Sequence, residues 1–91
     1  MRLTLAARIS LNPGKESAFD DFETRAAAIM ARHDGRIESR VRTGPGAELH
    51  LVTFPDRASF ERYRSDPDTL ALAELRASIV RETVIWFGEA P

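Results

Sequence analysis

The 91-residue sequence predicts one α+β domain with a four-stranded antiparallel sheet and two helical regions. Two observations lead to this prediction. Segments with an apolar period of two, which is typical of strands, are separated by segments with a period of three to four, which is typical of helices. Clusters of Asn, Pro, Gly and Asp fall where the period changes, as expected for turns and helix caps. The resulting order is strand, helix, strand, strand, helix, strand.

The first half of the chain begins with a strand and a long helix. Residues 2–11 alternate throughout and predict the strand, and Asn12-Pro13-Gly14 ends it because proline cannot extend a ladder. The stretch from Lys15 to His33 predicts the helix, with apolar residues at spacings of three and four. These residues are Ala18, Phe19, Phe22, Ala26, Ile29 and Met30, followed by His33. We expect Gly35 to adopt the left-handed conformation that ends many helices.

The second strand is predicted at residues 36–43, with Ile37 and Val41 on one face and charged residues on the other. That charge is typical of an edge strand. Gly44-Pro45-Gly46 predicts the turn to the third strand.

The third strand, residues 48–54, is apolar on both faces, which implies that both faces are covered. Leu49 and Leu51 lie on one face. His50, Val52 and Phe54 lie on the other.

The second helical region contains two capping signals. Asp56 is placed to cap a helix that ends near residue 64, and Asp66 is placed to cap another, with Pro67 at its first position. We therefore expect a kink and one continuous second helix over residues 67–78. Its apolar residues are Leu70, Leu72, Ala73, Leu75 and Ala77.

Residues 79–88 predict the last strand, and residues 89–91 a tail to the single domain 1–91. Two crossovers joined by a hairpin give the ferredoxin-like βαββαβ arrangement. Right-handed crossovers then place both helical regions on one face, with strand order 4-1-3-2. On the other face, Val52, Phe54 and either Trp86 or Phe87 would meet water, which is too apolar a patch for a monomer. We expect a homodimer that covers this face.

Composition excludes several functional classes. The net charge of −1 at pH 7 gives no reason to expect binding to nucleic acid or to an anionic membrane. No stretch approaches the ~18 apolar residues of a membrane helix. Arg8 interrupts the apolar N-terminal run, so we expect a cytoplasmic protein without a signal peptide. The chain has no cysteine, its two histidines lack metal-ligand spacing, and it has no Gly-rich nucleotide motif or nucleophile elbow. We therefore expect no metal and no cofactor.

The run FPDRASFERYRSDPDTLALAELR, residues 54–76, resembles the dimeric α/β-barrel superfamily. Members of that superfamily often have a strand ending in Phe-Pro-Asp, a helix with an aromatic residue, a Ser-Asp-Pro break and an Ala/Leu-rich segment ending in Arg. The motif Gly35-Arg36 leading to Arg40, and the closing residues 85–88, are similar too. The subgroup it most resembles comprises small domains of unknown function related to the antibiotic-biosynthesis monooxygenases. The resemblance implies a homodimer whose two sheets form a barrel, with a pocket between sheet and helices.

Three polar candidates fall on neighbouring predicted strands, namely Arg8, Arg40 and His50. An imidazole flanked by arginines would favour an anionic or phenolate-like ligand. The alternative is that these side chains form ion pairs with acidic residues on the same strands. Those acidic residues are Glu38, Glu48 and Glu82.

Three further candidates lie on the predicted helices. Tyr63 and Arg76 would line the helical side of a pocket. The alternative for Tyr63 is a ring packed in the core with its hydroxyl in contact with water. Arg76 would equally cap or pair near the end of its helix, and His33 would equally sit half-buried at a helix end.

Two functions fit these patterns. The first is a dimeric module that binds a small molecule without a clear catalytic constellation. The alternative is a cofactor-independent monooxygenase-like enzyme acting on a small aromatic or polyketide-like substrate, with His50, Tyr63 and Trp86 as pocket groups. The enzyme requires a cavity of at least ~300 Å³ between sheet and helices.

Overall fold

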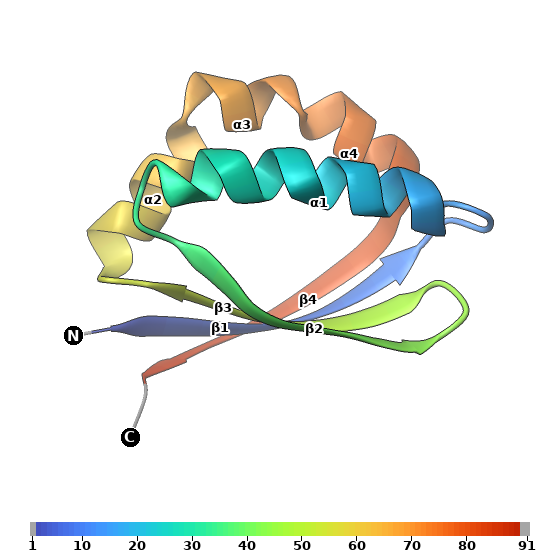
Figure 1. Cartoon of the computed structure of the whole chain (residues 1–91), viewed down its shortest axis with the longest axis horizontal. Helices are drawn as coiled ribbons and strands as arrows, with labels where there is room; N and C mark the ends of the chain where they lie inside the picture. Colours follow the sequence, from blue (N-terminus) through green and yellow to red (C-terminus); the bar gives the residue numbers. More distant parts are fainter. Residues whose placement is uncertain (1, 90–91) are drawn as a thin grey trace.

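The structure is a computed structural model that describes residues 2–89, with one four-stranded sheet and every helix on one side of it (Figure 1). The strands pair antiparallel in the order β2-β3-β1-β4. They are β1 (Leu3–Leu11), β2 (Arg36–Gly44), β3 (Ala47–Phe54) and β4 (Val80–Glu89). Helix α1 (Glu16–Ala31) connects β1 to β2. The second crossover contains α2 (Arg57–Ser65), α3 (Pro67–Ala71) and α4 (Ala73–Ile79). The predicted ferredoxin-like α+β fold and strand order are confirmed.

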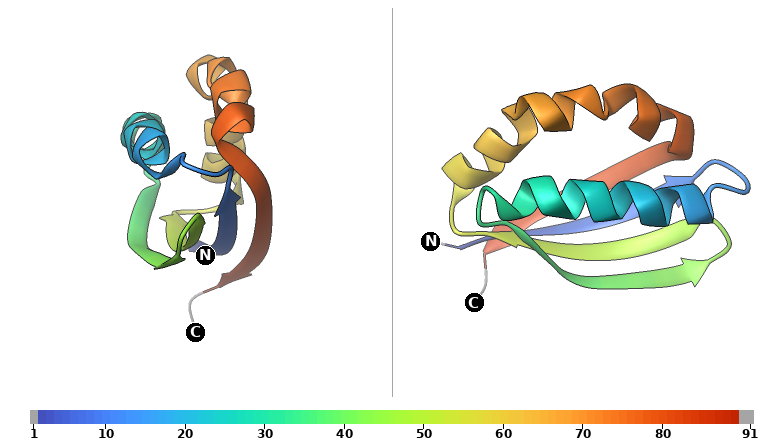
Figure 2. Two further views of the ribbon diagram at one scale, coloured as in Figure 1. Left: turned by 90° about the vertical axis from the view of Figure 1, so that its right-hand side faces the viewer. Right: turned by 45° about the horizontal axis from the view of Figure 1, so that its top comes forward.

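The sheet is curved, and α1 and the α2–α4 segment lie side by side over its concave side (Figure 2). The core between these layers consists of two clusters. One cluster contains Ile9, Leu11, Phe19, Phe22, Ala26, Ile79 and Val80, and the other contains Leu3, Leu5, Met30, Phe54 and Phe60. In the part of the chain that the structure describes, no helix has the length and apolarity needed to cross a membrane.

The face of β3 that packs under the helices is the one predicted to meet water, and the other face is exposed. Phe54 is 1% exposed and packs under the helices, with ring centroids 5.4 Å from Phe60 and 5.6 Å from Tyr63. Leu49 and Leu51 face away from the helices and are 45% and 44% exposed. The expectation that Val52 and Phe54 meet water was wrong. Both faces of this strand are apolar, so hydrophobicity alone could not assign them.

We call the side of the sheet away from the helices the open face. On it, Ala6 pairs with both Leu51 and Trp86, which places these side chains in one row. Val41 pairs with Leu49 and therefore lies on the open face too. The prediction that Ile37 shares a face with Val41 was wrong, because the register shifts between Ile37 and Ser39 and reverses the alternation.

The end of α1 also differs from the prediction. Asp34, not Gly35, has the left-handed conformation, with φ of 60°. The Gly35 N–H donates to the Met30 carbonyl at 3.0 Å, and the Asp34 N–H donates to the Ala31 carbonyl at 3.2 Å, which is a Schellman motif with Asp34 as its left-handed residue. Gly35 is needed for space instead. A Cβ there would lie 2.6 Å from both Met30 Cγ and Phe54 Cζ.

Both predicted caps in the second crossover are confirmed. Asp56 accepts from the Ser59 N–H at 2.8 Å, and Asp66 accepts from the Asp68 N–H at 2.9 Å. The expected continuous helix over residues 67–78 is divided, because the Leu72 N–H donates to the Thr69 carbonyl in a tight turn. This turn directs Leu72 toward the core and leaves Leu70 61% exposed.

The last strand begins one residue later than predicted and extends into the predicted tail. Ile79 ends α4, and β4 runs to Glu89. The rest of the predicted tail, Ala90 and Pro91, lies outside the described residues.

Candidate functional site

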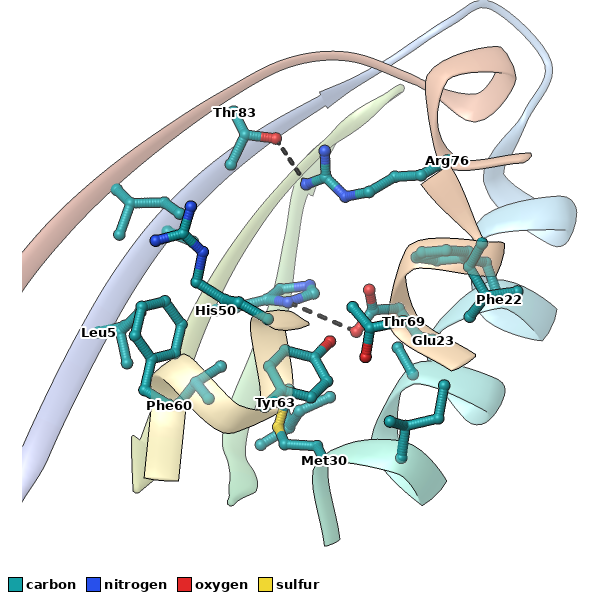
Figure 3. Close-up of a pocket in the computed structure, with 18 of the residues that line it drawn as sticks. Leu5, Phe22, Glu23, Met30, His50, Phe60, Tyr63, Thr69, Arg76 and Thr83 are labelled. Atoms are coloured by element: carbon teal, nitrogen blue, oxygen red, sulfur yellow. Dashed lines mark hydrogen bonds and ion pairs between the residues drawn. The ribbon is translucent and has the colours of Figure 1, made fainter. Parts of the chain in front are cut away.

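A cavity of about 420 Å³ lies between the sheet and the helices, where the two core clusters meet (Figure 3). Most of its wall is apolar and comes from both clusters. Small side chains leave the space open, since Ala7 on β1 and Ala26 on α1 both line it. The polar side chains that line it are Glu23, His50, Tyr63, Arg64, Thr69, Arg76 and Thr83. The cavity falls within the range of small-molecule sites, roughly 300–1,000 Å³.

His50 lies between two carboxylates at the sheet side of the cavity. It projects from the helix-facing row of β3 and is 5% exposed, with its ring stacked 5.8 Å from that of Phe19. Its Nε2 is 2.9 Å from Glu48 Oε1, a hydrogen bond. Its Nδ1 is 3.8 Å from Glu23 Oε2, which is longer than a hydrogen bond. Nε2 is thus hydrogen-bonded within the protein, whereas Nδ1 points toward Glu23 without a hydrogen bond to it.

Glu48 is the centre of a buried ionic network. Its side chain is 1% exposed and accepts hydrogen bonds from Arg40 Nε and Arg42 Nε, both at 3.0 Å. The same two arginines bond Asp20 on α1 at 2.9 and 3.0 Å. Burial by itself would raise the pKa of Glu48, but hydrogen bonds from His50, Arg42 and Arg40 outweigh it and hold the pKa below its ordinary value. Glu48 is therefore a fixed, ionised acceptor behind His50.

Glu23 and Tyr63 are the acidic groups of the cavity. Burial raises the pKa of Glu23, and the nearby charges of His50, Arg40 and Arg76 offset this only in part. Burial also raises the pKa of Tyr63 to about 12, with a further contribution from the Glu23 charge. Both groups therefore favour their protonated forms more than they would in water.

Arg76 and Thr69 complete the polar wall from the helical side. Arg76 donates to Thr83 Oγ1 at 2.8 Å, which holds the guanidinium against β4 in the cavity wall (Figure 3). The Thr69 hydroxyl is buried and has no hydrogen-bond partner among residues 2–89. A buried hydroxyl without a partner costs free energy that a bound ligand oxygen would recover.

The structure brings together three of the six predicted site residues. His50, Tyr63 and Arg76 line the cavity. Arg40 lies behind them, bonded to Glu48, as the ion-pair alternative predicted. Arg8 is on the open face and pairs with Glu82 at 3.2 Å, so the sheet separates it from His50.

The sixth candidate, His33, is away from the cavity. Its Nε2 is 2.7 Å from Asp66 Oδ2, which joins the end of α1 to the cap of α3. Arg32 bonds Asp68 at the same distance, 2.7 Å. His33 is thus a half-buried contact between two helices.

The prediction missed four polar residues of the cavity wall, namely Glu23, Arg64, Thr69 and Thr83. Glu23 could have been found, because it follows Phe19 by four residues and precedes Ala26 by three, which places it inside the apolar stripe of α1. A charged residue in such a stripe must face the core. Thr69 could not have been found, because its orientation depends on the unexpected turn at Leu72.

Solved structures with this fold include proteins of different description. Protein PA3566 from Pseudomonas aeruginosa is 18% identical, with 99% of this chain and 94% of that one covered and a TM-score of 0.80. SnoaB, a cofactor-independent oxygenase from Streptomyces nogalater, is 18% identical in its mutant form, with 98% and 92% covered and a TM-score of 0.79. An uncharacterised NIPSNAP domain protein from Burkholderia xenovorans is 14% identical, with 98% and 94% covered and a TM-score of 0.78.

These similarities establish the fold. The chain has the fold of the dimeric α/β-barrel proteins, as the sequence resemblance predicted. No family model matches the sequence, and no curated protein matches it either.

Proposed function

We propose that the protein binds a small aromatic molecule that carries oxygen atoms at one end, inside the cavity between sheet and helices. The observation that carries the proposal is the concentration of polar groups at one end of an otherwise apolar space. Glu23, His50, Tyr63 and Arg76 converge there, and leucine, isoleucine and phenylalanine side chains form most of the remaining wall. Ligand sites usually combine a large apolar surface with a few polar groups that set the orientation.

The polar groups specify the ligand's oxygens. A guanidinium has five N–H donors, and Arg76 uses one hydrogen bond to Thr83, so others can donate to a ligand carbonyl or phenolate. The carboxyl of Glu23 can accept from a ligand hydroxyl, and Thr69 supplies a hydroxyl without a protein partner. A molecule with a hydroxyl and a carbonyl oxygen near one edge of an aromatic ring matches this set.

We also propose that the protein is a homodimer formed through the open face. The exposed apolar residues Val41, Leu49, Leu51 and Trp86 support it, since Trp86 is 56% exposed. The charged pair on this face, Arg8 and Glu82, is neutral overall and would not repel a second copy. Apolar patches of this kind mark protein interfaces.

A second candidate is a cofactor-independent oxygenase-like enzyme acting on the same class of molecule. Two observations favour it. The cavity exceeds the ~300 Å³ that this activity requires, and the fold is shared with SnoaB, a cofactor-independent oxygenase. Oxygen uptake in the presence of 1-naphthol, above the rate in buffer, would support this candidate.

The binding function is tested with 1-naphthol and the aromatic ketone 2-tetralone by isothermal titration calorimetry. Ala73→Trp places a large side chain at the cavity wall from an exposed position on α4, and Ala77→Trp is the matched control one turn further, outside the wall. We expect saturable binding that Ala73→Trp weakens by about tenfold or more, equivalent to roughly 1.4 kcal/mol, and that Ala77→Trp leaves unchanged. Lack of saturable binding of both probes to the unmodified protein would overturn the proposal.

A further inference from the structure

We infer that His50 is a general base that removes a proton from the molecule bound in the cavity, and that Glu48 is the positioning residue that keeps Nδ1 of His50 free to accept it. This inference rests on the proposed binding function. It goes beyond that function because it makes the cavity a site of proton transfer. The substrates it implies are phenols and ketones with an acidic C–H next to the carbonyl.

The hydrogen bond to Glu48 fixes the tautomer of His50. Glu48 is ionised and can only accept, so the 2.9 Å contact requires a hydrogen on Nε2 of the imidazole. In the neutral ring the other nitrogen then has no hydrogen and carries a lone pair. Glu48 is itself held by the two arginines of β2, so it cannot rotate away without breaking their hydrogen bonds.

The lone pair on Nδ1 lies on the Glu23 side of the imidazole. His50 lines the cavity, and its Nδ1 is on the side of Glu23, 3.8 Å from Oε2 (Figure 3). This separation is too long for a hydrogen bond, so the protein leaves Nδ1 available to a ligand. A carboxylate behind an imidazole whose other nitrogen faces the reacting molecule is the arrangement that orients catalytic histidines.

Charged groups surround the His50 ring and act on it once it holds a second proton. The groups that face His50 are Glu48 on β3, Glu23 on α1 and Arg40 on β2, and Tyr63 and Arg76 also line the cavity. The ionised Glu48 carboxylate, hydrogen-bonded to Nε2, stabilises the imidazolium. Arg76 stabilises the negative oxygen that forms on the ligand.

The proton transfer is balanced without any other reactant. The O–H or C–H bond of the ligand breaks, its proton forms a bond to Nδ1, and the electron pair stays on the ligand as a phenolate or enolate. The proton on Nδ1 exchanges with water, and transfer of a solvent-derived proton from Nδ1 back to the ligand restores it. In deuterium oxide this cycle exchanges ligand hydrogen for deuterium.

The test follows deuterium exchange at the C–H groups beside the carbonyl of 2-tetralone by proton NMR, with binding measured separately by calorimetry. We expect the unmodified protein to accelerate exchange above buffer. A general base contributes about 10²–10⁴-fold, so His50→Gln should lose at least a hundredfold of that acceleration while the affinity stays within a few fold. His33→Gln is the matched control, because it removes the chain's other histidine away from the cavity.

Glu48 is tested in two ways, since removing a buried carboxylate can impair folding. Nitrogen–proton NMR of the unmodified protein should show the Nε2–H tautomer for His50. Glu48→Gln, shown to be folded by circular dichroism, should slow exchange relative to the unmodified protein.

The outcomes separate the two proposals. A protein that binds 2-tetralone but exchanges it at the buffer rate overturns the base and leaves the binding function standing. An Nδ1–H tautomer for His50 overturns the inference as well. Lack of binding to the unmodified protein overturns the proposed function itself.

Discussion

The two faces of the sheet have the same kind of apolar rows but different surroundings. On β3 the neighbours His50 and Leu51 point in opposite directions, and the first is 5% exposed whereas the second is 44% exposed. Under the helices the charged side chain of Glu48 pairs with arginines and a histidine within the chain. On the open face, the pair Arg8–Glu82 is exposed among apolar neighbours.

This difference separates two uses of apolar surface. The helix-facing side is covered by its own chain and leaves a cavity with a polar end, which suits a small ligand. The open face is apolar, exposed and without a cavity-forming cover, which suits a second sheet. A change on one face and a matched change on the other should therefore have different effects.

The largest expected effect is on the helix-facing side. Phe54→Ala should lower the free energy of unfolding by about 3–5 kcal/mol, since it removes a fully buried ring from the core. Leu51→Ala, on the same strand, should cost less than about 1 kcal/mol at protein concentrations that keep the chain monomeric. Urea denaturation followed by circular dichroism measures both. Equal losses would contradict the assignment of the two faces.

The sequence could predict the fold but not which face of β3 is buried. Strand order and connection handedness follow from the sequence of elements and from general rules, and these predictions were confirmed. The direction of Phe54 depends on the pairing register, and a shift by one residue reverses every side chain. The bulge beside Ile37 is such a shift, and no residue in that stretch indicates it.

The next comparison is between two glycines, Gly35 beside the helix-facing core and Gly88 on β4. Gly35→Ala should destabilise by about 1–3 kcal/mol, because the added Cβ overlaps the side chains of Met30 and Phe54. Gly88, which pairs with Thr4, has nothing within 4 Å of an added Cβ, so Gly88→Ala should be nearly neutral. Thermal denaturation of both variants gives the comparison. A neutral Gly35→Ala would mean that the helix-facing packing is looser than described.

The third effect concerns assembly. Leu51→Asp should raise the dissociation constant of the proposed dimer by more than about tenfold, because it places a charge at the centre of an apolar interface. Leu70→Asp is the control, as Leu70 is the most exposed leucine on the helical side, at 61%. Sedimentation velocity measures the constant. The chain's one tryptophan, Trp86, lies in the same row as Leu51 and should show red-shifted emission on dissociation.

A monomer at micromolar concentration in the unmodified protein would contradict the assembly. A dimer that survives Leu51→Asp but dissociates in Leu70→Asp would place the interface on the helices.

The candidate site was predictable only in part. Tyr63 and Arg76 follow from the helical segment that faces the sheet, whereas the side on which His50 lies depends on the buried face of β3, which the alternation alone does not fix. The role of Arg8 could not be predicted, because a residue on β1 lies one strand from His50 whichever face it occupies. The order of strands predicts how many strands separate two residues, but it does not predict whether their side chains lie on the same face of the sheet.

The smallest effect is a dependence of stability on alkaline pH that comes from Tyr63, the chain's one tyrosine. Stability at neutral pH is unchanged. The pKa of Tyr63 is raised to about 12 by burial beside Glu23, against about 10 for an exposed phenol. The folded protein therefore keeps the phenol proton at pH values where the unfolded chain has lost it. By linkage, the free energy of unfolding falls as pH rises from about 10 to about 12, and below that window it does not depend on this group.

Near-ultraviolet absorbance of the phenolate measures the titration, with circular dichroism on the same sample to show that the protein is folded. The urea-unfolded chain is the control and should titrate near the ordinary value. A phenol on the open face would titrate like this control in either state. If Tyr63 ionises near pH 10 while the chain is folded, the cavity admits water freely, and the contrast between a closed helix-facing side and an exposed open face does not hold at this position.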